Sequence, residues 1–237
     1  MDKQVCLEHY FDRRQEFQTQ TKNYKSLDPY SSAGISHSSA VTCLILRLAL
    51  AGVYAVTKEP IAAAEKEARA NAFRTVLADA KSFDNDEDID ARLSDKEALD
   101  ALFESDGIDG VRIDGVAVAK DADGNTLGWA ITVTSSSGYS GDITLAMGVT
   151  PDGVLTGISV IKQGETAGLG ANCAKEDFSS QFAEVSADKV TNTKNGASAE
   201  GEIDAISGAT VTTSAGVDAV NAGLLFARTH LLEGGAD

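Results

Sequence analysis

The segment Ser207-Gly208-Ala209-Thr210 has the residue types that point most directly to chemistry. It precedes an apolar stretch with helical spacing, so its small side chains and its glycine bring the backbone into a helix N-terminus. The unpaired N–H groups and the positive dipole end at such a terminus favour an anion. Thr210 is therefore positioned to carry or to contact a phosphate. The same spacing also fits a plain helix start with Ser207 as its N-cap, and spacing alone favours that interpretation.

A second group of small residues is Gly164-Glu165-Thr166-Ala167-Gly168-Leu169-Gly170, directly after a strand-like segment. The glycines that flank Leu169 permit close backbone approach to a flat ligand, and the leucine side chain is suited to lie against a ring face. The segment lacks GxGxxG spacing, so a Rossmann-type nucleotide site is not indicated. A flexible strand-to-helix loop remains the alternative.

Charge and composition limit the partners. The 237 residues carry 36 acidic and 20 basic side chains, a formal net charge of −16, so no basic footprint for nucleic acid is present and we expect no nucleic-acid partner. Any bound phosphate must then be held by local geometry, such as a helix N-terminus. Cysteines and histidines are scattered without ligand spacing, so we expect neither a metal site nor a disulfide framework.

The middle of the chain predicts a sheet. Segments rich in Val, Ile and Thr alternate with turn-forming residues such as Asp123-Gly124-Asn125 and Pro151-Asp152-Gly153. Short turns join antiparallel strands, so the predicted fold class is α+β, an antiparallel β-meander with flanking helices. The predicted strands are Gly110 to Lys120, Leu127 to Thr134, Asp142 to Val149 and Val154 to Lys162.

Helical spacing appears on both sides of this meander. One helix is predicted from Glu59, with Pro60 in its first turn, to about Ala80. Asp84 to Asp90 is interpreted as an acid-rich solvated loop. Further helices are predicted over Asp95 to Phe103, over Lys175 to Phe182, and from Ala209 or Thr212 to His230 with Ser207 as the cap.

The one extended apolar segment is Ala40 to Val56, at the short end of the length that spans a bilayer. Arg47 near its middle makes it a marginal span. A membrane anchor is favoured over a signal peptide or a buried soluble helix, and flanking charges do not settle its orientation. Residues Met1 to Ser39 are expected to form a mostly irregular tail.

The order of these features resembles the FMN-binding-domain family. The resemblance rests on the single apolar segment, Thr57-Lys58-Glu59-Pro60-Ile61, the meander, the Glu165–Gly170 loop and the Ser207–Thr210 segment. Within the family, the sequence resembles the G subunit of the Rnf complex, an ion-translocating ferredoxin:NAD oxidoreductase. The C subunit of the sodium-pumping NADH:quinone reductase is a more distant relative.

This resemblance implies specific ligand roles. In the family, a dedicated flavin transferase esterifies the threonine that ends the Ser/Thr-Gly-Ala-Thr motif to the FMN phosphate, which implies a covalent FMN phosphoester on Thr210. Ser207, Gly208 and Ala209 would form the tight approach to it. The family's loop against the flavin implies that Glu165, Thr166, Gly168, Leu169 and Gly170 border the ring, with Ala167 in place of the usual proline. The Gly138-Tyr139-Ser140-Gly141 turn resembles the family's glycine-tyrosine turn.

The implied function is that of an electron-carrying subunit without substrate turnover or catalytic residues of its own. Its partners would be the other subunits of an Rnf-type complex in a bacterial cell membrane, with the FMN domain on the non-cytoplasmic side. The implied organisation is a tail (1–39), a single transmembrane anchor (40–57), a helical juxtamembrane region (58–105) and an FMN-binding domain (106–237). The alternatives are the corresponding subunit of the sodium-pumping reductase and a flavin-free scaffold domain.

Overall fold

The computed structural model describes residues 32–232, with side chains from residue 42 onward. Its contacts divide the chain into two compact units, residues 1–61 and 62–237, and each is described by itself. Most of the expected irregular tail, residues 1–31, lies outside the described residues. From Ser32 the chain is helical, so the expectation of an irregular backbone is wrong for residues 32–39.

A single helix, α2 (Ser32–Val76), replaces the helix that was predicted to begin at Glu59. Pro60 lies inside α2 and not in a first turn, which corrects that prediction. A proline removes one helical hydrogen bond, but the apolar stretch before it and the alanine-rich stretch after it are good helix formers. The side chains from Thr42 to Val56 are exposed. Among the described residues, no helix combines the length and the apolar character needed to cross a membrane.

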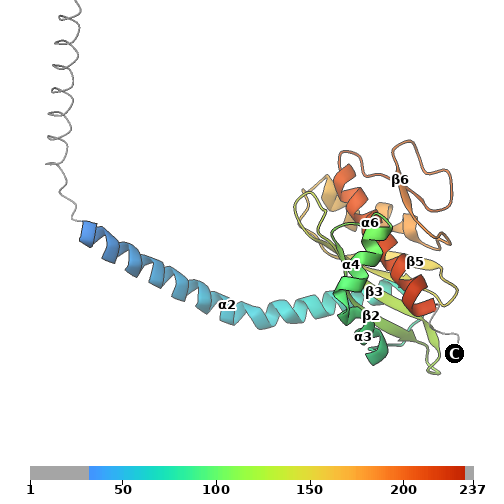
Figure 1. The fold of residues 1–237 in the computed structure, drawn as a ribbon, viewed down its shortest axis with the longest axis horizontal. Coiled ribbons are helices and arrows are strands. Elements are labelled where there is room, and N and C mark those ends of the chain that lie inside the picture. The colour runs from blue at the N-terminus through green and yellow to red at the C-terminus, as the bar shows by residue number, and fades with distance from the viewer. Residues whose placement is uncertain (1–31, 233–237) are drawn as a thin grey trace, which may run out of the picture. The chain divides into compact units, whose positions relative to one another are not determined.

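The second unit is built on a five-stranded antiparallel sheet in the order β1-β2-β3-β4-β5 (Figure 1). The predicted meander and α+β class are confirmed, and each long strand begins within about a residue of its predicted position. The first strand was not predicted, because three residues are too short for a period to appear. The strands are β1 (Ser82–Asp84), β2 (Val111–Lys120), β3 (Thr126–Ser135), β4 (Ile143–Val149) and β5 (Leu155–Lys162).

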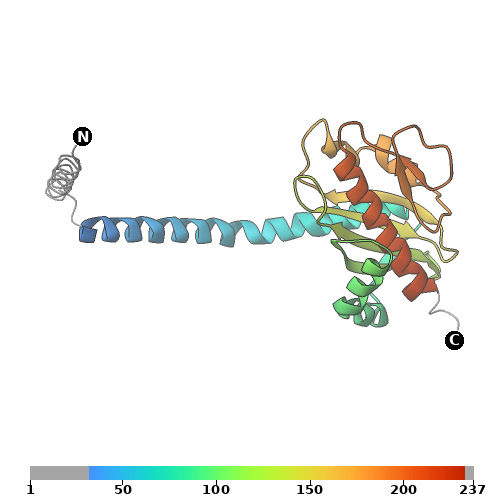
Figure 2. The same cartoon turned by 45° about the horizontal axis from the view of Figure 1, so that its top comes forward.

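Large apolar side chains cover one face of this sheet, where α6 (Thr210–Phe226) crosses the strands (Figure 2). Ile131, Val133 and Met147 are fully buried there with Val220 and Phe226 of the helix. A methyl group at Gly223 would lie only 2.1 Å from Met147 Sδ, so the helix and the sheet pack closely at this glycine. This packing fixes the position of α6, and hence of its first residue, relative to the strands.

The other face carries small side chains and receives the end of α2. Ala117, Ala130 and Ala146 are buried there against Phe73 and Val76. The alternation of large and small side chains along each strand follows from the two-residue period of a sheet, which sends neighbours to opposite faces. The sheet is therefore covered by helices on both faces.

Two short helices lie between β1 and β2, α3 (Glu87–Ser94) and α4 (Lys96–Ser105). The Asp86 carboxylate accepts from the N–H groups of Asp88 and Ile89, at 2.9 and 3.3 Å, and caps α3. The acid-rich segment is therefore a capped helix start from residue 86 onward, which corrects the predicted loop. Acidic residues suit that position because they face the positive end of the helix dipole. The predicted Asp95–Phe103 helix is confirmed as α4.

Between β5 and α6 the chain makes short elements. The predicted helix over Lys175 to Phe182 consists instead of α5, which is one turn, followed by a 3₁₀ turn, so its continuous form is wrong. The last helix is confirmed, but it is α-helical only to Phe226 and continues as a π-helix. The elements are η1 (Gly170–Ala174), α5 (Glu176–Ser179), η2 (Ser180–Phe182), the parallel pair β6 (Thr191–Thr193) and β7 (Glu202–Asp204), α6, and η3 (Ala227–Leu232).

Candidate functional site

The helix start predicted at Ser207–Thr210 is present, but its cap is not the predicted one. Thr210 is the first residue of α6, and the N-cap position is Ala209, which makes no side-chain capping bond. Gly208 adopts φ +75°, a left-handed conformation that glycine adopts readily, and the Ala209 N–H donates to the Ile206 carbonyl at 3.0 Å. This tight turn moves the N-cap position two residues beyond Ser207, which is exposed. The N-terminal N–H groups of α6 thus have no side-chain cap.

A buried hydroxyl inside the helix holds this turn in place. Thr213 Oγ1 accepts from the Ile206 N–H at 3.1 Å and donates to the Ala209 carbonyl at 2.9 Å. The residue is fully buried, so these bonds are shielded from water. This role of Thr213 is not predictable from the sequence, because a threonine in the first turn of a helix gives no signal of what its hydroxyl contacts. Thr210 is therefore exposed next to a turn that the buried Thr213 hydroxyl holds in place by two hydrogen bonds.

The loop from Glu165 to Gly170 is compact although Ala167 stands where a proline was expected from the family pattern. The Thr166 carbonyl accepts from the N–H groups of Leu169 and Ala171, at 3.1 and 3.2 Å. Asn172 Nδ2 donates to the Gly168 carbonyl at 3.2 Å. These bonds close the loop on itself, so backbone hydrogen bonding restrains it without the ring constraint of a proline.

Glu165 connects three segments of the site. Its side chain is buried, with the residue 8% exposed, and each carboxylate oxygen accepts a hydrogen bond. Oε2 accepts from Thr212 Oγ1 of α6 at 2.7 Å, and Oε1 accepts from the backbone N–H of Ser140 at 2.9 Å. Hydrogen bonds to a charged acceptor in a buried place are among the stronger ones in proteins. We call this arrangement of Glu165, Thr212 and Ser140 the carboxylate latch.

Glycines let the backbone close around this latch. A methyl group at Gly170 would lie 2.4 Å from Glu165 Oε2 and 2.6 Å from Thr212 Oγ1. At Gly138 it would lie 2.2 Å from the Gly141 carbonyl oxygen and 3.0 Å from Glu165 Oε1. No side chain fits at either distance, so both positions need glycine for reasons of space. The second motif and the glycine-tyrosine turn therefore converge on one buried carboxylate.

The two motifs also meet directly. A methyl group at Gly208 would lie 3.2 Å from Leu169 Cδ2, so the leucine side chain rests over the turn that precedes Thr210. Leu169 is 46% exposed, and Val211 and Tyr139, at 51% and 75%, are exposed as well. These three are the exposed large apolar side chains among the described residues of the second unit. They all belong to segments joined by the latch, which is the pattern expected of an apolar ligand surface.

Cys173 lies behind the loop and is buried. Burial raises the pKa of its thiol, and the nearby Glu165 charge raises it further. The thiol is therefore protonated at neutral pH and is a poor nucleophile, so it acts here as a packing group.

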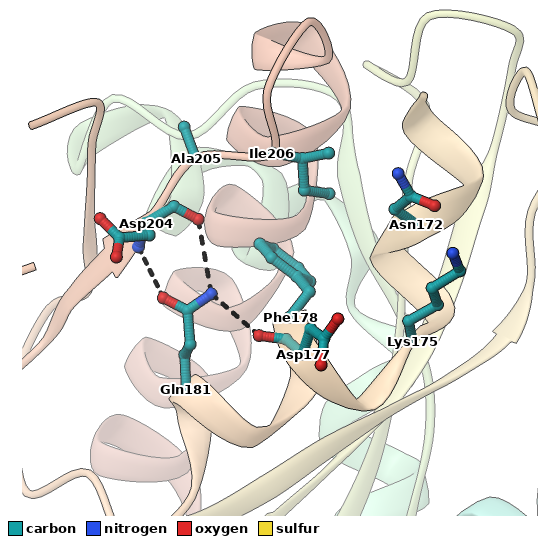
Figure 3. A pocket seen from close by; sticks show the side chains of 8 residues that line it. All are labelled: Asn172, Lys175, Asp177, Phe178, Gln181, Asp204, Ala205 and Ile206. Atoms are coloured by element: carbon teal, nitrogen blue, oxygen red, sulfur yellow. Dashed lines mark hydrogen bonds between the residues drawn. The ribbon is translucent and has the colours of Figure 1, made fainter. Parts of the chain in front are cut away.

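A pocket of about 270 Å³ opens beside these motifs (Figure 3). Its lining includes Asn172, which holds the Glu165–Gly170 loop, and Ile206, which directly precedes Ser207. Gln181 and Asp204 also line the pocket and are joined by a hydrogen bond, in which Gln181 Oε1 accepts from the Asp204 N–H at 2.7 Å. The remaining lining residues are Lys175, Asp177, Phe178 and Ala205.

Comparison with known families identifies the region that contains this site. The family model described as FMN-binding domain matches residues 138–225, from the glycine-tyrosine turn to the end of α6. Residues 138–225 are thus similar to an FMN-binding domain. The latch, the turn before Thr210 and the pocket all lie inside this matched region. The residues present fit an FMN group, because the region has a helix N-terminus without a side-chain cap for an anion and an exposed apolar surface beside it.

Relatives with curated names are components of ion-translocating complexes. The chain is 29% identical over 191 residues to the G subunit of the proton-translocating ferredoxin:NAD(+) oxidoreductase complex of Clostridium ljungdahlii, covering 81% of this chain and 89% of that protein. It is 38% identical to the G subunits of the Na(+)-translocating ferredoxin:NAD(+) oxidoreductase complex of Acetobacterium woodii and of the ion-translocating oxidoreductase complex of Methanosarcina acetivorans, covering 42% and 43% of this chain. The aligned part spans about half the length of these two proteins, 49% and 52%.

Two solved structures show a weaker likeness. NqrC of Shewanella oneidensis gives a TM-score of 0.43 at 23% identity, covering 51% of this chain and 61% of that one. The C subunit of the Na(+)-translocating NADH-quinone reductase of Parabacteroides distasonis gives 0.41 at 27% identity, covering 48% and 60%.

Proposed function

We propose that this protein is the electron-carrying subunit of a membrane-bound, Rnf-type ion-translocating ferredoxin:NAD oxidoreductase. The observation that carries the proposal is the match of residues 138–225 to the FMN-binding-domain model, in a chain whose relatives described above are named as the G subunits of ion-translocating complexes. In this function the chain turns over no substrate of its own. It passes electrons between redox centres that other subunits hold, and those subunits are its partners.

We further propose that the FMN is covalent, joined by a phosphoester to the Thr210 hydroxyl. Thr210 is exposed at the first position of α6, where no side chain caps the helix, and an ester there would direct phosphate oxygens toward the free N–H groups. In a chain of net charge −16, this local site offsets the general repulsion of an anion. A flavin transferase is the expected partner for the attachment.

The remaining motif residues have supporting roles in this proposal. Ser207, Gly208 and Ala209 form the approach to Thr210. The loop of Glu165, Thr166, Gly168, Leu169 and Gly170 borders the flavin, with the latch holding it against α6. When bound, FMN supplies the ability to accept and donate electrons, while the protein sets its position and its electrostatic surroundings.

The membrane part of the proposal concerns residues 40–57 of α2. We propose that this segment is a single-pass anchor and that the FMN domain lies on the non-cytoplasmic side. The support is the apolar composition of the segment and the exposure of its side chains from Thr42 to Val56. A covalent link suits a carrier on that side, because a flavin lost there is not readily replaced.

The test of covalent attachment is the intact mass of the protein co-expressed with a flavin transferase. The wild type should gain the mass of one FMN less one water, and its denatured gel band should fluoresce. Thr210→Ala should lose both signals. Thr126→Ala removes an exposed hydroxyl at the start of β3, outside both motifs, and should keep both. A denatured Thr210→Ala band that still carries flavin would show that Thr210 is not the attachment site.

Two other functions give different results in the same preparation. A subunit of a sodium-pumping NADH:quinone reductase would carry the same flavin but would co-purify with the membrane subunits of that enzyme. A flavin-free scaffold domain would be colourless even when the transferase is present. Purification from the native membrane, followed by identification of the bound subunits, distinguishes a subunit of the sodium-pumping reductase from a subunit of an Rnf-type complex.

A further inference from the structure

The pocket beside the attachment turn has two chemically different walls. Figure 3 shows Phe178 and Ile206 on one side, with the side chains of Asn172 and Lys175 facing them across the opening. The first wall is apolar, and the second presents an amide and an ammonium group. We call this pocket the ring slot. Small-molecule sites combine apolar contact area with placed polar groups, and both are present in this lining.

The slot lies between the two motifs of the FMN-binding domain. Ile206 is the first residue of the turn that directly precedes Thr210, because its carbonyl accepts from the Ala209 N–H at 3.0 Å. Asn172 holds the other motif through its 3.2 Å bond to the Gly168 carbonyl. A group tethered to Thr210 by a short flexible chain therefore has the slot within reach. At about 270 Å³ the slot has room for part of a cofactor and not for the whole of one.

The charges around the slot are of both signs. Lys175 is exposed, and its ammonium group makes no hydrogen bond or ion pair with any residue the structure describes, so it is free to face a ligand. Asp177 lies on the neighbouring part of the lining and is exposed as well. The second carboxylate, Asp204, already accepts from the Ala197 N–H at 2.7 Å. In a chain of net charge −16, an unpaired ammonium group at a pocket indicates a ligand that carries negative charge at that side.

We propose that the ring slot receives the isoalloxazine ring of the FMN and that Lys175 is the positioning residue that favours the reduced form. This rests on the proposed attachment of FMN to Thr210. Phe178 and Ile206 would contact the dimethylbenzene part, and Asn172 and Lys175 would face the pyrimidine edge. When bound, FMN would supply two-electron chemistry whose reduced form, with one proton gained, carries a negative charge at the pyrimidine edge that Lys175 would face. A cation at that edge stabilises the negative charge and raises the midpoint potential.

The experiment measures the midpoint potential of flavinylated protein at low ionic strength. Lys175→Met should lower the potential, Lys175→Arg should keep it near the wild-type value, and Asp177→Asn should raise it. A tenfold weaker preference for the reduced form lowers a two-electron potential by about 30 mV, and we expect a change of roughly this size. The matched control is Lys81→Met, which makes the same charge change at an exposed residue directly before β1, at the sheet edge opposite β5 and outside the slot lining, and should leave the potential unchanged.

The outcomes separate this inference from the function on which it rests. Each variant is first checked by intact mass for one FMN. If the flavinylated Lys175→Met and Lys81→Met proteins have the same potential, or if Asp177→Asn shifts it in the same direction as Lys175→Met, the slot does not hold the ring, although the attachment stands. A wild-type protein that carries no covalent FMN would overturn both.

Discussion

Gly170→Ala is the substitution that tests the carboxylate latch most directly. The added methyl group would lie 2.4 Å from Glu165 Oε2 and 2.6 Å from Thr212 Oγ1, inside contact distance of both partners of one hydrogen bond. The partners cannot both stay in place. Either the loop moves away from α6 or the bond opens, and in both cases the two motifs separate.

The magnitude follows from two contributions. Overpacking by one methyl group costs about 1 to 3 kcal/mol of the free energy of unfolding. Loss of a buried hydrogen bond to a charged acceptor adds about 1.5 to 3 kcal/mol if the carboxylate finds no other donor. We therefore expect a loss of about 3 kcal/mol, since relaxation of the loop reduces the sum. For a unit of residues 62–237, this corresponds to a fall of about 6 to 12 °C in the melting temperature.

The assay is thermal and urea unfolding of the flavin-free chain, so that cofactor binding does not contribute. Gly164→Ala is the control in the same loop, because its methyl group would meet only the Ser140 carbonyl oxygen at 3.9 Å. This variant should unfold within about 0.5 kcal/mol of the wild type. Equal stability of Gly170→Ala and Gly164→Ala would refute the latch as a stabilising contact.

Three further perturbations have defined outcomes. A double-mutant cycle of Glu165→Gln and Thr212→Val should give a coupling free energy of unfolding of about 1 to 2 kcal/mol, whereas additive effects would mean that the two side chains do not interact in solution. Thr132 Oγ1 is buried with no hydrogen-bond partner among the described residues, so Thr132→Val should raise the free energy of unfolding by about 1 kcal/mol. Urea titrations measure this change, and a destabilised variant would indicate an internal water bound to the Thr132 hydroxyl. Burial and then the charge of Arg92 lower the pKa of His230 below its ordinary 6.5, so the folded state binds fewer protons and stability falls as pH drops through 6.5 toward the folded pKa. The His230→Phe variant should lose this part of the pH dependence in unfolding experiments between neutral and acid pH, and an unchanged profile would assign it to other groups.

The site shows where sequence reasoning succeeds and where it stops. Small residues and glycines identified both motif segments in the sequence. A backbone that lies close to another part of the chain or to a ligand requires these residue types in any fold. The cap was assigned to Ser207 by residue type, but the left-handed turn at Gly208 moved the helix start to Thr210. Thr213 and Ser140 gave no signal, since their roles depend on partners that only the folded chain brings to them.

The sequence by itself determined the elements whose pattern is local: the four long strands, the turns between them and the last helix. Periodicity and turn chemistry are properties of neighbouring residues, so they are readable without a fold. Only the tertiary structure decided that Glu165, Thr212 and Ser140 meet at one carboxylate, and that Leu169 lies over the turn before Thr210. The bonds of the latch join residues 25 and 47 positions apart, and their geometry depends on how α6 packs across the sheet.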